Sequence, residues 1–127
     1  MRILILPLLA GAMMIGACSS QDDGPQVSFK NDLLPVLEAN CAKCHSGPDS
    51  KGTKVSGVRL DSYEGIMAGT KFGPIVDPGY PASSVLNQVI EGRVDKSIAM
   101  PHDTETLLSE TKQKLFRDWV AQGANNN

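Results

Sequence analysis

The residues of this chain best suited to chemistry lie in one short segment, Cys41-Ala42-Lys43-Cys44-His45. Two residues separate the cysteines, so at the start of a helix both thiols point to the same side. Each thiol can bond one vinyl group of a haem, and the histidine beside the second cysteine then falls under the iron. The spacing therefore predicts one c-type haem attached through Cys41 and Cys44, with His45 as an axial ligand.

Three other kinds of site use similar residues. A dithiol oxidoreductase also has a C-x-x-C sequence, but it expects a preceding strand and an α/β pattern. A zinc site could recruit the motif together with His102, although adjacent Cys44 and His45 are awkward ligands for one tetrahedral ion. A structural disulfide between Cys41 and Cys44 would be strained and would close almost no loop. A haem is therefore the favoured interpretation.

The sixth ligand of a haem iron would come from elsewhere in the chain, and Met100 is the favoured candidate. Pro101 removes a backbone donor and stiffens the chain beside it, so a rigid loop could hold the thioether against iron. The alternatives are His102, Met67 or no ligand, and Met100 could also be a core residue.

The state of that sixth position separates two functions. Six-coordinate iron suits an electron carrier, whereas an open or labile sixth position suits gas binding or peroxidase-type chemistry. The chain has only two histidines, and no acid–base partner is marked for His102. We therefore expect electron transfer, with no enzymatic activity and no small-molecule substrate.

Short helices between long loops must position these residues. Apolar residues at helical spacing predict a helix from near Asp32 to Asn40, directly before the cysteine motif. Glycine and proline predict loops over 46–57 and 71–81. Further helices are expected from Asp61 or Ser62 to Ala68, over 82–91, and from the N-cap Ser109 to the stop at Gly123. No segment alternates like a β-strand, so the expected fold is all-α.

The N-terminus predicts export. Arg2 precedes an uncharged apolar run over 3–16 that is too short for a comfortable membrane span, as in secretory signals. Small residues before Cys18 resemble a bacterial lipoprotein signal, so we expect removal of residues 1–17 and acylation of Cys18. An ordinary signal peptide with an incidental Cys18 is the alternative. A flexible tether (18–27), one domain (28–124) and a short tail (125–127) would follow.

Charge and targeting indicate which partners to expect. The chain has 12 basic and 14 acidic residues without a basic cluster, which argues against binding nucleic acid. A multiply acylated Cys18 would anchor the protein to a membrane. Ser19 resembles the residue that directs lipoproteins to the outer membrane, so we expect the periplasmic side of that membrane, with redox proteins as partners.

The order of these features resembles a small class I cytochrome c domain, in particular the planctomycete-like subgroup of exported bacterial haem proteins. The resemblance spans Ser28 to Ala124. Its segments are Leu33-x-Pro35-Val36-Leu37, the haem motif with the preceding Asn40, Arg59 to Gly65, Gly73-Pro74, Pro78-Gly79, Ser83/Ser84-x-Leu86, Met100-Pro101, Leu108-Ser109 and Trp119-Val120-x-x-Gly123-Ala124. It implies crossing first and last helices, a pocket closed by the methionine loop, haem c on Cys41 and Cys44, and iron ligation by His45 and Met100.

Arg59 and Tyr63 are candidate partners for a haem propionate. A buried carboxylate needs a charged or hydrogen-bonding partner, and Arg59 follows a glycine-rich loop with Tyr63 nearby. The alternative is that Arg59 is an exposed loop residue.

Overall fold

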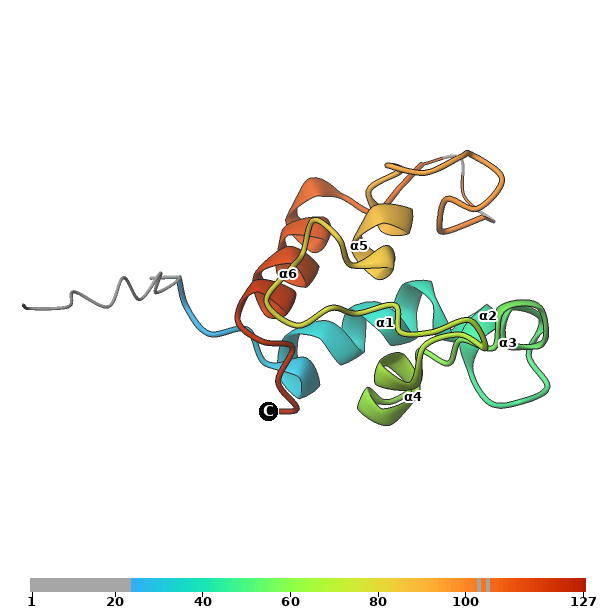
Figure 1. Ribbon diagram of the computed structural model, residues 1–127, viewed down its shortest axis with the longest axis horizontal. Coiled ribbons are helices and arrows are strands. Elements are labelled where there is room, and N and C mark those ends of the chain that lie inside the picture. Colours follow the sequence, from blue (N-terminus) through green and yellow to red (C-terminus); the bar gives the residue numbers. More distant parts are fainter. Residues whose placement is uncertain (1–23, 103, 105) are drawn as a thin grey trace, which may run out of the picture.

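The computed structural model describes residues 24–102, 104 and 106–127, which form short helices joined by long loops (Figure 1). In chain order the elements are η1 (Phe29–Leu33), α1 (Leu34–Asn40), α2 (Ala42–His45), α3 (Lys51–Ser56), α4 (Tyr63–Ala68), α5 (Val85–Ile90) and α6 (Glu110–Ala121). Among the described residues there is no strand, only an isolated bridge between Thr70 and Gly73. The predicted all-α fold is confirmed.

The first helical segment begins earlier than its sequence suggests, with the π-helical turn η1. Ser28 caps it, because its Oγ accepts a hydrogen bond from the Asn31 N–H at 3.1 Å. Asp32 completes the cap by accepting from the Ser28 N–H at 2.8 Å. Pro35 falls in the first turn of α1, where its missing N–H costs no α-helical bond. The segment therefore runs through to Asn40 and delivers the cysteine motif.

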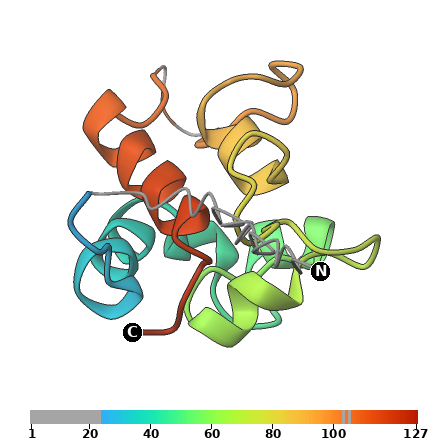
Figure 2. The same ribbon diagram turned by 60° about the vertical axis from the view of Figure 1, so that its left-hand side comes forward.

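The last helix, α6, packs against η1 and α5, so the first and last helical segments meet in one core (Figure 2). Leu33 and Leu37 from the first segment are fully buried together with Phe116 and Trp119 from α6. This crossing of the first and last helices is the arrangement that the resemblance implies.

Hydrogen bonds hold the tail after α6 to both α6 and η1. The indole N–H of Trp119 donates to the Asn125 carbonyl at 2.9 Å. The Lys30 N–H donates to the Asn127 carbonyl at 3.0 Å. Residues 125–127 thus lie along the start of the first helical segment.

Helix α3 lies where a loop is predicted, and this part of the loop prediction is wrong. Ser50 occupies its N-cap position, and Gly57 follows it with φ 82°, a left-handed conformation that suits glycine. Gly52, Thr53 and Val55 have low intrinsic helix propensity, so the local sequence does not predict a helix. The helix packs against α2, and this tertiary contact compensates for the weak local preference.

The other helices lie close to their predicted positions. Ser62 caps α4 by accepting from the Gly65 N–H at 3.0 Å. Helix α5 is shorter than expected because Ser84 turns back to the preceding loop, accepting from the Asp77 N–H at 2.8 Å. Helix α6 begins directly after Ser109, as its capping pattern predicts.

The predicted signal sequence, Cys18 and the first part of the tether lie outside the described residues. In the part of the chain that the structure describes, no helix has both the length and the hydrophobicity to cross a bilayer.

Candidate functional site

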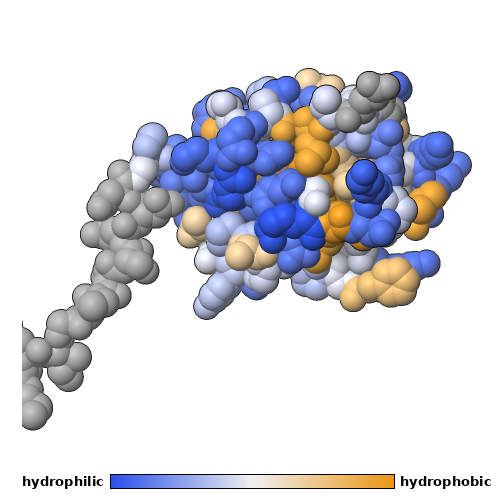
Figure 3. Space-filling view, turned by 90° about the horizontal axis from the view of Figure 1, so that it is seen from above, coloured by the Kyte–Doolittle hydropathy of each residue, from blue (hydrophilic) through white to orange (hydrophobic). Residues whose placement is uncertain are grey.

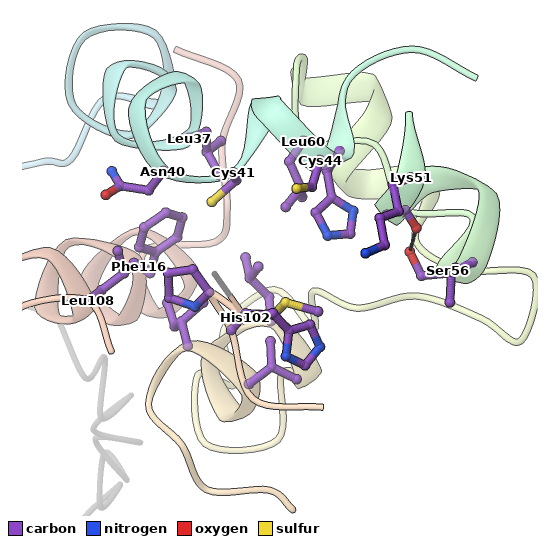
Figure 4. Close-up of a pocket in the computed structure, with 18 residues that line it drawn as sticks. Leu37, Asn40, Cys41, Cys44, Lys51, Ser56, Leu60, His102, Leu108 and Phe116 are labelled. Carbon is purple, nitrogen blue, oxygen red and sulfur yellow. Dashed lines mark hydrogen bonds between the residues drawn. The ribbon is translucent and has the colours of Figure 1, made fainter. Parts of the chain in front are cut away.

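A cavity of about 430 Å³ lies between the cysteine motif, α3, α5 and α6 (Figure 4). This volume is in the range of small-molecule and cofactor sites. Most of its lining is apolar, and that part comprises Leu37, Val55, Leu60, Leu86, Val89, Ile90, Met100, Pro101, Leu108 and Phe116. Seen from the side of α5 and α6, hydrophobic surface also forms a band between hydrophilic areas (Figure 3). The site is therefore suited to a large, mostly apolar group.

Cys41 and Cys44 lie on one wall of this cavity as free thiols (Figure 4). Their spacing is set by the start of α2, where the Cys44 N–H donates to the Cys41 carbonyl at 3.0 Å. Burial raises the pKa of the Cys41 thiol to about 11; the charge of Cys44 adds to this effect and Lys112 opposes it. Cys41 is therefore protonated at neutral pH.

His45 is buried on the same wall, with 8% of the residue exposed. Its Nδ1 atom lies 3.2 Å from the carbonyl oxygen of Val58. Because a carbonyl can only accept, Nδ1 carries a proton in this contact, so the lone pair of the neutral ring lies on Nε2. The His45 carbonyl in turn accepts from the Leu60 N–H at 2.7 Å. Ring and backbone are thus both held by residues 58–60, which leaves Nε2 able to bind a metal.

Gly52 of α3 lies against the free edge of this imidazole. A Cβ at this position would lie 2.6 Å from Cε1 and 2.7 Å from Nε2 of His45, and 2.5 Å from the Cys44 carbonyl oxygen. Only glycine permits so close an approach. The role of Gly52 is not visible in the sequence, because nothing local distinguishes it from the other glycines of that region.

Met100 and His102 both line the same cavity as the cysteine motif. The Met100 N–H donates to the Val89 carbonyl in α5 at 3.0 Å, and the Met100–Pro101 peptide is cis. His102 is exposed, and its ring lies across the cavity from the two cysteines (Figure 4). Met67 instead packs against the main core and does not line the cavity. The structure thus leaves two candidate side chains for a sixth ligand.

Arg59 and Tyr63 lie outside the cavity lining and have partners of their own. The Tyr63 hydroxyl donates to the Ala124 carbonyl at 3.0 Å. The half-exposed Arg59 donates to both carboxylate oxygens of Asp61 at 3.2 Å. Contact of either residue with a propionate stays a prediction, and these partners do not favour it.

The carboxylate of Asp61 links Arg59 to the loop after the haem motif. It accepts from the Gly47 N–H at 2.9 Å. Desolvation would raise the pKa of Asp61, but the bonds from Gly47 and Arg59 outweigh it and hold the pKa below its ordinary value.

The arrangement argues against the competing kinds of site. Both motif cysteines are free thiols, and among the described residues no three His, Cys, Asp or Glu side chains gather to hold a metal ion. The C-x-x-C sequence follows a helix, not the strand that a thioredoxin-like protein would have. Two thiols, an imidazole nitrogen and a thioether that line one apolar cavity are a donor set that fits haem c.

An all-α fold with this site defines a cytochrome c-like domain. Residues 41–103, from the first cysteine of the motif to just beyond Met100, match the family described as Planctomycete cytochrome C. The chain therefore carries a planctomycete-like cytochrome c domain, and this membership supports haem binding and electron transfer. No curated protein and no solved structure matches the chain.

Proposed function

We propose that this protein is a single-electron carrier with one haem c, attached through Cys41 and Cys44 and ligated by His45 and Met100. The observation that carries the proposal is the meeting of both thiols, the His45 ring and Met100 at one apolar cavity. When bound, the haem supplies a one-electron Fe(III)/Fe(II) couple.

The residues around the cavity suit this role because they hold the ligands and surround them with apolar side chains. The Val58 carbonyl fixes the tautomer and orientation of His45, and the Val89 carbonyl fixes the backbone of Met100. Leu37, Leu86 and Phe116 line the space between, so the iron would lie in a region of low polarity. A thioether ligand favours the reduced state relative to a second histidine ligand. An apolar setting favours the reduced state as well.

A haem with a labile sixth position is the second candidate function. It is favoured by His102, which lines the same cavity two residues beyond Met100 and could serve as a polar group beside an open sixth position. If Met100 did not ligate the iron, a gas or a peroxide could bind at that position.

Absorption spectra of the oxidised and reduced protein, made in a host that matures c-type haem, test the proposal. We expect covalently bound haem and a weak band near the red end of the ferric spectrum that reports methionine–iron bonding. Met100→Leu should lose this band and keep the haem. The matched control Met67→Leu removes a thioether outside the cavity and should keep the band. Wild-type protein without the band would contradict His/Met ligation and favour the second candidate.

We also propose that the protein is anchored by lipid on Cys18 at the periplasmic side of the outer membrane and exchanges electrons with redox proteins there. The small residues before Cys18 and the serine after it support this location. Cys18→Ser should move the protein from the membrane fraction to the soluble fraction without changing its spectrum. Retention of the variant in the membrane fraction would contradict lipid anchoring.

A further inference from the structure

The carbonyl oxygen that holds the His45 ring has a second hydrogen-bond donor. Thr53 of α3 donates from Oγ1 to the Val58 carbonyl at 2.9 Å, and the His45 Nδ1 atom lies 3.2 Å from the same oxygen. Thr53 and His45 are each 8% exposed. The two donors therefore share the two lone pairs of one buried oxygen.

Thr53 is itself part of a relay of hydroxyl groups. Ser50 donates from its Oγ to Thr53 Oγ1 at 2.8 Å, with a longer contact of 3.3 Å to the Gly47 carbonyl. A hydroxyl that accepts a hydrogen bond becomes a stronger donor, because chained bonds polarise one another. The relay thus runs from Ser50 through Thr53 to the Val58 oxygen.

We propose that Thr53 raises the reduction potential of the haem by competing with His45 for the Val58 carbonyl. An acceptor that already receives one strong bond is a poorer acceptor for the second donor. The hydrogen bond from His45 Nδ1 is then weaker, so the ring is less electron-rich and its Nε2 donates less charge to the iron. Weaker donation disfavours the ferric state and raises the potential.

This inference rests on the proposed function, because it takes His45 as an iron ligand. Thr53 does not line the cavity, so it is a positioning residue that acts through Val58 and His45. A purely structural role is the alternative, since its hydroxyl also ties α3 to the loop that follows it. The two roles differ in whether the electronic state of His45 responds to the hydroxyl.

Thr53→Val in the haem-loaded protein separates these roles, because it removes the hydroxyl and keeps the shape of the side chain. We expect a more negative midpoint potential by spectroelectrochemistry. We also expect a downfield shift of the His45 Nδ1 proton in the NMR spectrum of the ferrous form. Thr53→Ser restores the hydroxyl and should restore both values. Thr70→Val is the matched control, since the Thr70 hydroxyl donates to the Gly73 carbonyl outside the cavity.

Ser50→Ala gives a second measurement that leaves Thr53 in place. The Ser50 side chain accepts no hydrogen bond from the backbone amides of α3, so the helix should persist without it. Loss of its donation to Thr53 should shift the potential in the same direction by a smaller amount. This variant keeps the inference testable where Thr53→Val does not load haem.

The outcomes distinguish failure of this inference from failure of the proposed function. The tuning role is overturned if the wild-type spectrum is normal but Thr53→Val has an unchanged or more positive potential. Ser50→Ala takes the place of Thr53→Val if that variant does not load haem. Either result leaves His45 ligation intact. Wild-type protein without the spectrum of a c-type haem overturns both.

Discussion

Gly52 packs against the imidazole edge of His45 so closely that a Cβ would lie 2.7 Å from Nε2. The contact joins α3 to the last residue of α2, and it brings a helix with weak local propensity onto the predicted iron ligand. Close packing therefore requires glycine at this position, and the contact with His45 stabilises α3.

Gly52→Ala should destabilise the protein and lower its haem content. Alanine is better than glycine in a helix by about 1 kcal/mol, so a local effect alone would stabilise α3. Collision with the ring and with the Cys44 carbonyl should outweigh this gain and cost roughly 1–3 kcal/mol in the free energy of unfolding. Denaturant titration and the haem-to-protein absorbance ratio measure both effects.

Gly47→Ala is the control for that substitution. A Cβ at Gly47 meets nothing within 4 Å, although its φ of 64° strains any other residue. It should cost roughly 1 kcal/mol through the backbone and leave the haem content unchanged. A Gly52→Ala protein at least as stable as wild type, with full haem content, would contradict the packing requirement.

Tyr63→Phe should lower the free energy of unfolding by about 1 kcal/mol, because the Ala124 carbonyl loses its donor. The ring itself should keep its edge-to-face contact with Phe29, whose centroid lies 5.3 Å away. Since Tyr63 lies outside the cavity lining, the midpoint potential should not change. A shifted potential with unchanged stability would instead support a propionate contact.

Arg59→Ala tests the other candidate propionate partner. Its exposed ion pair with Asp61 should contribute less than about 1 kcal/mol to stability. The pKa of Asp61 should rise toward its ordinary value once the guanidinium is removed. We expect an unchanged midpoint potential, measured beside Arg93→Ala as a second arginine outside the cavity. A change confined to Arg59→Ala would place a propionate near it.

In the haem-free chain, the Cys41 thiol should ionise only at high pH. Burial raises the pKa of Cys41 to about 11, from an ordinary value of 9.0, so iodoacetamide labelling should rise only as the pH approaches 11. Site-resolved mass spectrometry separates Cys41 from Cys44. In urea, where burial is lost, the midpoint should fall toward 9.0. Equal midpoints in folded and unfolded chains would contradict a buried thiol.

The same shift gives a pH dependence of stability for the haem-free chain. Between pH 9.0 and about 11 the unfolded thiol loses its proton and the folded one retains it. The unfolded state then binds fewer protons, so the free energy of unfolding falls as pH rises through this window. Below pH 9.0 Cys41 contributes no such dependence, and haem attachment should abolish it.

Local signals were sufficient for much of the helical framework. Ser62 and Gly69 flank α4, and Ser109 precedes α6, because capping preferences are properties of a few neighbouring residues. The haem motif is equally local, since its chemistry depends on spacing within one turn.

The features that escaped prediction depend on contacts between distant segments. Helix α3 contains poor helix formers and exists through its packing on α2. Tyr63 is the first residue of α4, yet its hydroxyl bonds to a residue 61 positions away. The double use of the Val58 carbonyl likewise emerges only when α3 has folded against His45.

The residues that line the cavity come from separate stretches of chain, because Cys41 and Cys44 lie at α2 and the Met100 backbone is bonded to Val89 of α5. In a protein with two thioether bonds, heat or denaturant that frees Met100 from α5 would leave the haem attached to the α2 segment. A coloured preparation is therefore no guarantee of a native one. Quality control during purification should follow the methionine–iron band, because colour survives the disassembly that this band records.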